Sequence, residues 1–374
     1  MRVPRRPAWA EIDLGAIAAN YKALATHAGV PVMGVVKADA YGHGAVEVCR
    51  ALEPLNPPML AVATLGEAVE LREAGIVRPV MIFSCLLKKE AQAVVEGDFT
   101  PQISDLGFAQ RLSDASVKAG KQTAVHLKVD TGMGRCGVLP SEAVEAGQKL
   151  SRLPGLRMEG LMTHFPSSDE ADGVEFTESQ IKRFKGICDA LAERGVRVKW
   201  RHAANSGGTL GYPGSWFDMV RPGMSVYGVY PSPEVQRDVP LRQAMTLKAE
   251  VALVKKIAQG ETISYGRTYT APRDMRVALV PIGYADGYDR RFSNQGAVLA
   301  RGRRFPVVGR VCMDQFMVDV TDGPDIAVGD EVVLYGKQGE EEIAIGDAAD
   351  TIGTIPQVIV TSVSRRVPRV YLGA

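Results

Sequence analysis

The sequence predicts an α/β fold, a (β/α)8 barrel of the TIM type, followed by a mostly-β C-terminal domain. From about residue 8 to residue 240, short apolar runs alternate with amphipathic stretches of helical periodicity. Such alternation is typical of a parallel sheet, and eight repeats of it are typical of a closed barrel. Beyond residue 240, alternating and β-branched runs separated by Gly/Asp turns replace the helical pattern. At 374 residues the chain is long enough for two domains, which we place at residues 1–240 and 241–374.

The predicted barrel strands are apolar runs of the length and composition of buried parallel strands. They cover residues 32–36, 60–64, 80–84, 100–103, 125–129, 156–162, 196–200 and 217–220. The predicted helices include residues 14–25, 45–52, 66–74, 88–96, 106–119, 141–150 and 177–194. In the second domain we expect strands at 247–254, 275–280, 297–300, 306–311, 316–320 and 331–334, and a short helix at 345–351. An open doubly wound sheet is the alternative, but no GxGxxG fingerprint follows the first strand.

Composition excludes several classes of partner. The formal net charge is +1, so no electrostatic feature favours nucleic acid or an anionic membrane. No apolar segment follows Met1 to Pro7, and no run reaches membrane-spanning length, so we expect no secretory signal and no membrane span. The five cysteines are scattered and form no CxxC, which favours reduced thiols in a cytoplasm and argues against a zinc site.

The most informative stretch runs from Val35 to Gly44. An apolar run ends on Lys37, a turn rich in small residues follows, and a helix begins at Ala45. A lysine at the carboxyl end of a barrel strand faces the mouth of the fold, where its amine, partly desolvated, becomes a usable nucleophile and base. The alternative for a single lysine is a side chain that reaches out to water.

Polar residues also follow the later strands. Lys128 and Arg135 follow the fifth, His164 the sixth, Asn205-Ser206-Gly207-Gly208 the seventh, and Arg221 with Gly223-Met224 the eighth. Each glycine pair alone indicates a tight turn, but loops after strands seven and eight often bind phosphate. Together with a lysine across the barrel they favour a phosphate-bearing aldehyde cofactor, pyridoxal 5′-phosphate (PLP).

Three clusters in the second domain also have the composition of a site: residues 263–269, 282–288 and 308–315. Tyrosines between glycines often pack against turns. For Tyr269 and Tyr288 this packing role is as good an interpretation as a role in a site. We expect Cys312 to be an inert thiol because no base is near it in sequence.

These motifs together resemble those of the alanine racemases, along most of the chain. The resemblance implies that Lys37 holds PLP and acts as one of two acid/base groups, and that Tyr265 of a partner subunit is the other. It also implies a homodimer with shared active sites. Arg221 would bind the pyridine nitrogen, with His164 between it and the tyrosine. Arg135 and the backbone N–H of Met313 would hold the substrate carboxylate. The further cofactor contacts implied are Tyr41, Asn205, Ser206, Gly223, Met224 and Tyr284.

Two positions need separate comment. Lys128 matches a lysine that some family members carry as a carbamate. Gln357 stands where many members have a tyrosine that bonds the phosphate and narrows the entrance. Glutamine can still donate to a phosphate but is smaller, so we expect a looser entrance or weaker retention of PLP.

The sequence therefore predicts a cytoplasmic isomerase that interconverts L-alanine and D-alanine and supplies D-alanine for peptidoglycan. A serine or broad-range amino-acid racemase of the same fold is the alternative. A PLP-dependent decarboxylase of the same architecture is disfavoured, because Met313 and not aspartate follows Cys312. A single-barrel PLP carrier is disfavoured by the chain length.

Overall fold

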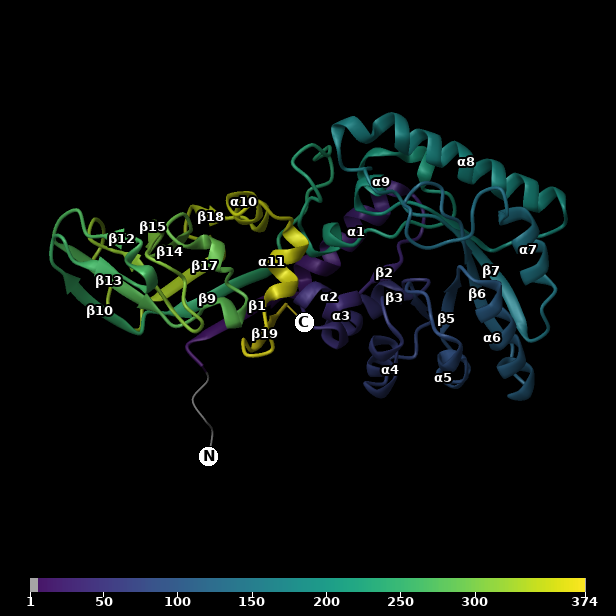
Figure 1. Ribbon diagram of the computed structural model, residues 1–374, viewed down its shortest axis with the longest axis horizontal. Helices are drawn as coiled ribbons and strands as arrows, with labels where there is room; N and C mark the ends of the chain where they lie inside the picture. The colour runs from purple at the N-terminus through teal and green to yellow at the C-terminus, as the bar shows by residue number, and fades with distance from the viewer. Residues whose placement is uncertain (1–5, 374) are drawn as a thin grey trace.

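The computed structural model describes residues 6–373, which form a barrel and an elongated β-rich arm. Figure 1 shows the arm extending from one side of the barrel, with the C-terminus lying near the junction. Among the described residues, no helix is both long enough and apolar enough to cross a bilayer.

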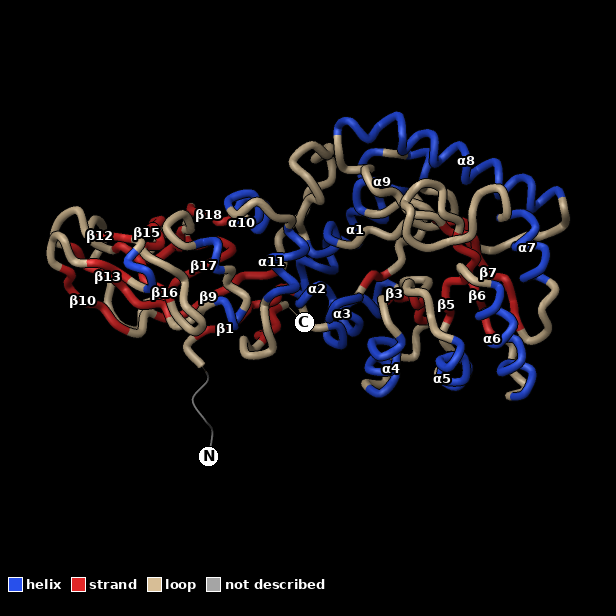
Figure 2. The backbone as a smooth tube through the Cα atoms, in the orientation of Figure 1, coloured by secondary structure: helices blue, strands red, loops and turns tan. Residues whose placement is uncertain are grey.

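The barrel is built on a parallel sheet whose strands are neighbours in chain order. Its strands are β2 (Gly34–Val35), β3 (Leu60–Val62), β4 (Val80–Ile82), β5 (Thr100–Ile103), β6 (Thr123–Lys128), β7 (Leu156–Met162) and β8 (Trp200–His202). They are apolar on both faces because helices cover the outside, as Figure 2 shows in blue around red strands. The helices with these strands are α1 (Leu14–Ala28), α3 (Ala45–Leu52), α4 (Leu65–Glu73), α5 (Ala91–Glu96), α6 (Leu106–Lys118), α7 (Ala143–Ser151), α8 (Val174–Glu193) and α9 (Ser206–Gly211).

The eighth predicted strand, residues 217–220, does not form a regular strand. It makes one parallel bridge, Val220 with Val32. Asp218 N–H still donates to Arg201 O at 3.0 Å, and Val220 N–H donates to Pro31 O at 3.0 Å, so the segment connects β8 to the start of β2. Pro222 ends it, because proline has no N–H to extend the ladder.

The seventh strand also begins later than predicted. The alternating residues 196–199 form the approach to β8, and the strand itself begins at Trp200. His202 therefore lies inside the strand and is fully buried.

The backbone adopts a left-handed conformation immediately after Lys37. Ala38, Asp39, Ala40 and Tyr41 all have φ of 52–53°, one turn of left-handed helix within α2 (Lys37–Gly42). For L-residues this conformation costs about 1–2 kcal/mol per residue, so surrounding contacts must hold it. The Asp39 carboxylate accepts from Ala45 N–H at 2.7 Å, and Arg369 donates to Gly42 O at 3.0 and 3.1 Å.

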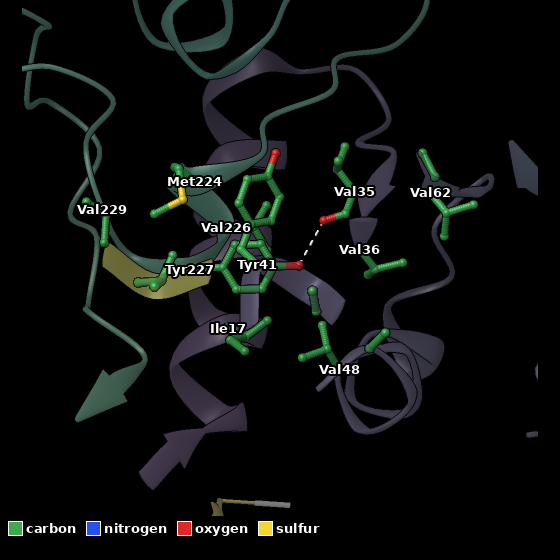
Figure 3. Close-up of a cluster of buried hydrophobic side chains, with 14 of the residues drawn as sticks. Ile17, Val35, Val36, Tyr41, Val48, Val62, Met224, Val226, Tyr227 and Val229 are labelled. Carbon is green, nitrogen blue, oxygen red and sulfur yellow. Dashed lines mark hydrogen bonds between the residues drawn. The ribbon is translucent and has the colours of Figure 1, made fainter. Parts of the chain in front are cut away.

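A small aromatic core fixes the strand that precedes this turn. Figure 3 shows Ile17, Val35, Tyr41 and Tyr227 gathered in it. The hydroxyl of Tyr227, a fully buried side chain, donates to Val35 O at 2.8 Å. The tilted rings of Tyr41 and Tyr227 have centroids 5.1 Å apart. These contacts set the position of Lys37 at the end of β2.

The second sheet contains a strand from the start of the chain. β1 (Ala8–Asp13) pairs antiparallel with β9 (Met245–Glu250) and parallel with β19 (Arg369–Leu372). The division at residue 240 places this segment with the barrel, whereas its hydrogen bonds place it in the β-rich arm. Its alternating buried and half-buried residues are typical of a strand with one covered face.

The other strands of the arm largely follow the predicted positions. They are β10 (Leu253–Ile257), β13 (Met275–Val280), β14 (Ala297–Ala300), β15 (Arg303–Val308), β16 (Phe316–Asp319), β17 (Glu331–Gln338) and β18 (Glu341–Ile343), with a separate hairpin of β11 (Thr262–Ile263) and β12 (Tyr269–Thr270). The predicted helix is α10 (Ile345–Thr351), and a further helix, α11 (Pro356–Ser362), follows it and packs on α2.

Candidate active site

A cavity of about 560 Å³ opens at the carboxyl ends of the barrel strands. Most of the predicted site residues line it: Lys37, Tyr41, Lys128, Arg135, His164, Asn205, Ser206, Arg221, Gly223, Met224 and Gln357. The structure therefore brings together residues that are up to 320 positions apart in the sequence (Lys37 to Gln357). Three predicted residues, Tyr265, Tyr284 and Met313, lie elsewhere.

Lys37 lines this cavity, and the pKa of its amine is lowered. Burial, the Arg135 charge and the Arg221 charge lower its pKa, against an opposing effect of Glu67. Glu67 is fixed by the backbone, because its carboxylate accepts from Ala38 N–H and Ala63 N–H, both at 2.7 Å. A lowered pKa increases the neutral fraction of the amine, the form that acts as nucleophile and base.

Arg221 is a buried cation held by acceptors on every side. One Nη donates to Nδ1 of His202 at 2.9 Å, and the other donates to the carbonyls of Thr163 and Ala203 at 2.8 and 3.0 Å. The second Nη also lies 3.3 Å from Nδ1 of His164. Burial lowers the pKa of Arg221 to about 9, so the guanidinium remains charged at neutral pH.

The arginine fixes the tautomers of both histidines. A guanidinium can only donate, so Nδ1 is the acceptor in His202 and in His164, and the ring proton lies on Nε2. Burial and the Arg221 charge lower the pKa of each histidine well below its usual range, so both rings are neutral. His164 therefore carries an N–H that is not used toward Arg221.

Outside the cavity lining, the chain of polar contacts continues through three residues that the sequence motifs do not single out: His202, His126 and Glu159. Nε2 of His202 lies 2.7 Å from Nδ1 of His126, whose own Nε2 is 3.9 Å from the Glu159 carboxylate. His126 and Lys128 alternate with buried Val125 and Leu127 on β6. Two polar residues at a spacing of two in an apolar strand are the signal that could have identified His126.

Tyr41, Ser206, Gly223 and Met224 line one part of the cavity, which we call the oxyanion cup. The Ser206 hydroxyl accepts from Gly223 N–H at 3.0 Å, at the point where α9 begins. A side chain at position 223 would not fit, since its Cβ would lie 2.3 Å from the Tyr41 hydroxyl. The hydroxyls of Tyr41 and Ser206 and the N–H group of Met224 can donate to a phosphate, so these residues fit the phosphate of PLP.

Asn205 lines the cavity but has a structural contact set. Its Oδ1 accepts from Gly208 N–H at 3.0 Å and from the Ser168 hydroxyl at 2.7 Å, and its Nδ2 donates to Phe165 O at 3.1 Å. The side chain caps α9 and ties it to the loop after β7, which positions Ser206.

Lys128 and Arg135 form the wall beside the cup. Lys128 is only 4% exposed, and burial lowers its pKa to about 8 with the Arg135 charge acting in the same direction. Arg135 follows a tight loop, in which the Asp130 carboxylate accepts from the N–H groups of Gly132, Gly134 and Arg135 at 2.9–3.1 Å. This capped loop gives the exposed Arg135 guanidinium a fixed base.

Gln357 lies in the first turn of α11, and its Oε1 is buried without a partner among the described residues. Its side chain lines the cavity. The effect of its size on cofactor retention stays a prediction.

Tyr265, Tyr284 and Met313 lie on the β-rich arm, outside the cavity of their own barrel. Their exposed fractions are 71%, 42% and 52%. Tyr284 N–H donates to Cys312 O at 3.1 Å, and the Ser264 hydroxyl donates to Arg310 O at 2.7 Å, so the arm brings its three predicted clusters together. Figure 1 shows the nearby hairpin strand β12 far out on this arm. The predicted site residues of one chain thus lie in two separate places, the barrel cavity and the arm.

Comparisons with known proteins agree with this arrangement. The sequence model of the alanine racemase N-terminal domain matches residues 12–231, and that of the C-terminal domain matches residues 244–371. The chain is 46% identical to an alanine racemase of Symbiobacterium thermophilum, covering 98% of each chain. It is 42% identical to alanine racemase 2 of Caldanaerobacter subterraneus subsp. tengcongensis, covering 98% of this chain and 95% of the relative.

Solved structures show the same similarity. The alanine racemase from D-cycloserine-producing Streptomyces lavendulae superposes with a TM-score of 0.94 at 38% identity, covering 100% of this chain and 98% of that one. These relatives are alanine racemases, so the alternative of a serine or broad-range racemase is not favoured.

Proposed function

We propose that this chain, which belongs to the alanine racemase family, interconverts L-alanine and D-alanine with PLP bound in the barrel cavity. The observation that carries this proposal is the cavity itself, which holds a perturbed lysine, a buried arginine and an oxyanion cup together. PLP, when bound, stabilises the electron pair left on the α-carbon after its proton departs. All other steps fall to residues of this chain.

The residues divide between holding the cofactor and holding the substrate. Lys37 provides the amine that links to the cofactor aldehyde, and Arg221 donates to the pyridine nitrogen. Tyr41, Ser206 and the backbone at Gly223 and Met224 hold the phosphate, with the amide of Gln357 at its edge. Arg135 and the Met313 N–H hold the substrate carboxylate, which fixes the α-carbon between the two acid/base groups.

Inversion at the α-carbon requires proton transfer on both faces, and Lys37 serves only one of them. We assign the other face to Tyr265 of the partner subunit in a homodimer with shared sites. The exposure of Tyr265, Tyr284 and Met313 on the arm supports this assignment, because each of them would otherwise face solvent. The His164 N–H that is not used toward Arg221 can donate to the tyrosine oxygen and favour its ionised form.

D-alanine made in this way would supply peptidoglycan synthesis. We assign the enzyme to the cytoplasm, since five scattered cysteines without a CxxC are typical of a reducing compartment. A net charge of +1 favours neither nucleic acid nor membrane as a partner.

Lys128 is expected to carry a carbamate. Its pKa of about 8 leaves a neutral amine available near that pH, and the Arg135 and Arg221 charges lie close enough to stabilise an anion. The amine nitrogen bonds to the carbon of CO2 and releases one proton. With ¹³C-bicarbonate, a carbamate resonance should grow between pH 6 and pH 8 and be missing from Lys128→Gln. A wild-type spectrum identical to that of the variant would exclude the modification.

Chiral product analysis tests the proposed function. The PLP-loaded protein is incubated with L-alanine in heavy water, and the L- and D-alanine products are separated by chiral chromatography. The deuterium content of each enantiomer is then measured by mass spectrometry. D-alanine carrying α-deuterium is expected, since the proton is returned from solvent-exchanged groups. Deuterium in L-alanine without any D-alanine would mean that the acid/base group on the face of the L-alanine α-proton works and that the group on the opposite face does not. No exchange at all would refute the proposal.

A further inference from the structure

Two of the five cysteines lie in the same cavity as the proposed active site. Cys85 follows the carboxyl end of β4, and Cys136 lies in the loop after β6, directly beside Arg135. Only β5 separates the two strands in the sheet. From β5, the buried amide of Gln102 donates to the Cys85 sulfur at 3.3 Å and so fixes that thiol at the strand ends.

The other cysteines have different surroundings. Cys49 and Cys188 are buried in helices α3 and α8. Cys312 lies on the arm, 3.3 Å from the Ser264 hydroxyl. Cys85 and Cys136 are thus the two cysteines that the fold brings to the same cavity, although 51 positions separate them in sequence. Both face a cavity that must admit a small amino acid, so a small oxidant can reach them.

We propose that Cys85 and Cys136 form a reversible disulfide when the protein meets a peroxide, and that this disulfide inhibits the enzyme. The second half of this statement rests on the proposed function, through the role given to Arg135. Disulfides in reducing compartments are usually transient, and many of them act as redox sensors.

The chemistry balances with peroxide as the two-electron oxidant. The more exposed Cys85 attacks first as a thiolate: an S–O bond forms, the O–O bond breaks and hydroxide leaves. The Cys136 thiolate then attacks the oxidised sulfur, so that the S–S bond forms and the S–O bond breaks. Overall, two thiols and one hydrogen peroxide give one disulfide and two molecules of water, whose hydrogens come from the two thiols and from the peroxide. Excess dithiol reverses the reaction by exchange.

The environment of the pair agrees with this order. Burial and the neighbouring Cys85 raise the pKa of Cys136, while the Lys128 and Arg135 charges act against the increase. A thiol with a raised pKa reacts faster as the pH rises, because the thiolate is the nucleophile. The attack of Cys136 on the oxidised Cys85 should therefore accelerate as the pH rises.

Inhibition follows from the position of Cys136 in the capped loop. Arg135 is its covalent neighbour, and Asp130 holds the backbone on the other side of the arginine. Drawing Cys136 toward β4 shifts the base of the Arg135 side chain relative to the substrate carboxylate. A displacement of about 1 Å in a positioning group can lower the rate by about 10²-fold.

The experiment treats the PLP-loaded protein with hydrogen peroxide, blocks free thiols by alkylation and maps disulfide-linked peptides by mass spectrometry. Racemisation is measured before oxidation, after oxidation and after dithiothreitol. Cys85→Ser and Cys136→Ser are compared with Cys188→Ala, a matched control outside the cavity. We expect a peptide joining Cys85 to Cys136, a loss of activity of about 10²-fold that dithiothreitol reverses, and no reversible loss in either serine variant.

The outcomes separate the two proposals. Absence of the Cys85–Cys136 peptide, or equal reversible loss in Cys85→Ser and wild type, would overturn the disulfide. If the linked peptide forms and activity is unchanged, the proposed inhibition is refuted, but the proposed disulfide stands. If the reduced protein shows no racemisation, the proposed function fails, while the peptide map still decides whether the disulfide forms.

Discussion

Replacing Lys37 with alanine is expected to lower racemase activity by at least about 10⁴-fold. The substitution removes both the amine that links the cofactor and the acid/base group on one face of the substrate. Burial holds that amine at the end of β2 with a lowered pKa, and no other lysine lining the cavity lies beside the Tyr41 ring, whose centroid is 5.8 Å from Lys37 Nζ.

Activity is measured with saturating PLP and alanine in both directions. The cofactor linkage is followed separately by borohydride reduction and peptide mapping, which should label the peptide containing residue 37 in wild type only. Lys118→Ala, an exposed lysine on α6, is the matched control and should match wild type. Activity of Lys37→Ala within tenfold of wild type would refute the assignment.

Two inactive variants are expected to restore activity when they share a dimer. Tyr265→Phe alone should lose about 10²–10⁴-fold, because the acid/base group on the second face is missing. In a dimer of Lys37→Ala with Tyr265→Phe, one site combines both defects and the other has neither. Such a mixed dimer should have about half the specific activity of wild type, given two equivalent sites related by two-fold symmetry.

The two variants are expressed together with different affinity tags, and dimers carrying both tags are purified. A doubly tagged dimer of Lys37→Ala with itself is the matched control and should remain inactive. A site formed within one chain would leave both sites of the mixed dimer defective. Absence of recovered activity in an intact mixed dimer would therefore contradict the shared site.

The barrel could be predicted because strand and helix leave different periodicities in the sequence. Residues 345–351 and 45–52 form helices at the predicted bounds. The sequence pattern does not show which strands pair with one another. Ala8–Asp13 alternates as a strand should, but nothing in six residues says that its neighbours are β9 and β19. The segment 217–220 is apolar enough for a strand, yet Pro222 limits it to one bridge.

The site could be predicted where function and strand position coincide. Lys37 and Arg221 end or follow apolar runs, and the family resemblance gave them roles. His126, His202 and Glu159 were missed because their importance lies in contacts behind the cavity, between strands β6, β7 and β8. A buried hydrogen-bond chain depends on register between strands, which the spacing within one strand does not contain.

The pairing of β1 with β19 has a consequence for synthesis of the chain on the ribosome. Residues 8–13 leave the exit tunnel long before their parallel partners at 369–372, because Ala10 pairs with Arg369, 359 positions later. At about 5–20 residues per second, the first strand waits roughly 20 to 70 s for its neighbour. The turn after Lys37 waits as well, because Arg369 is what holds Gly42 O. The barrel strands can assemble earlier in translation, but the reactive lysine reaches its final setting only after Arg369 has left the exit tunnel.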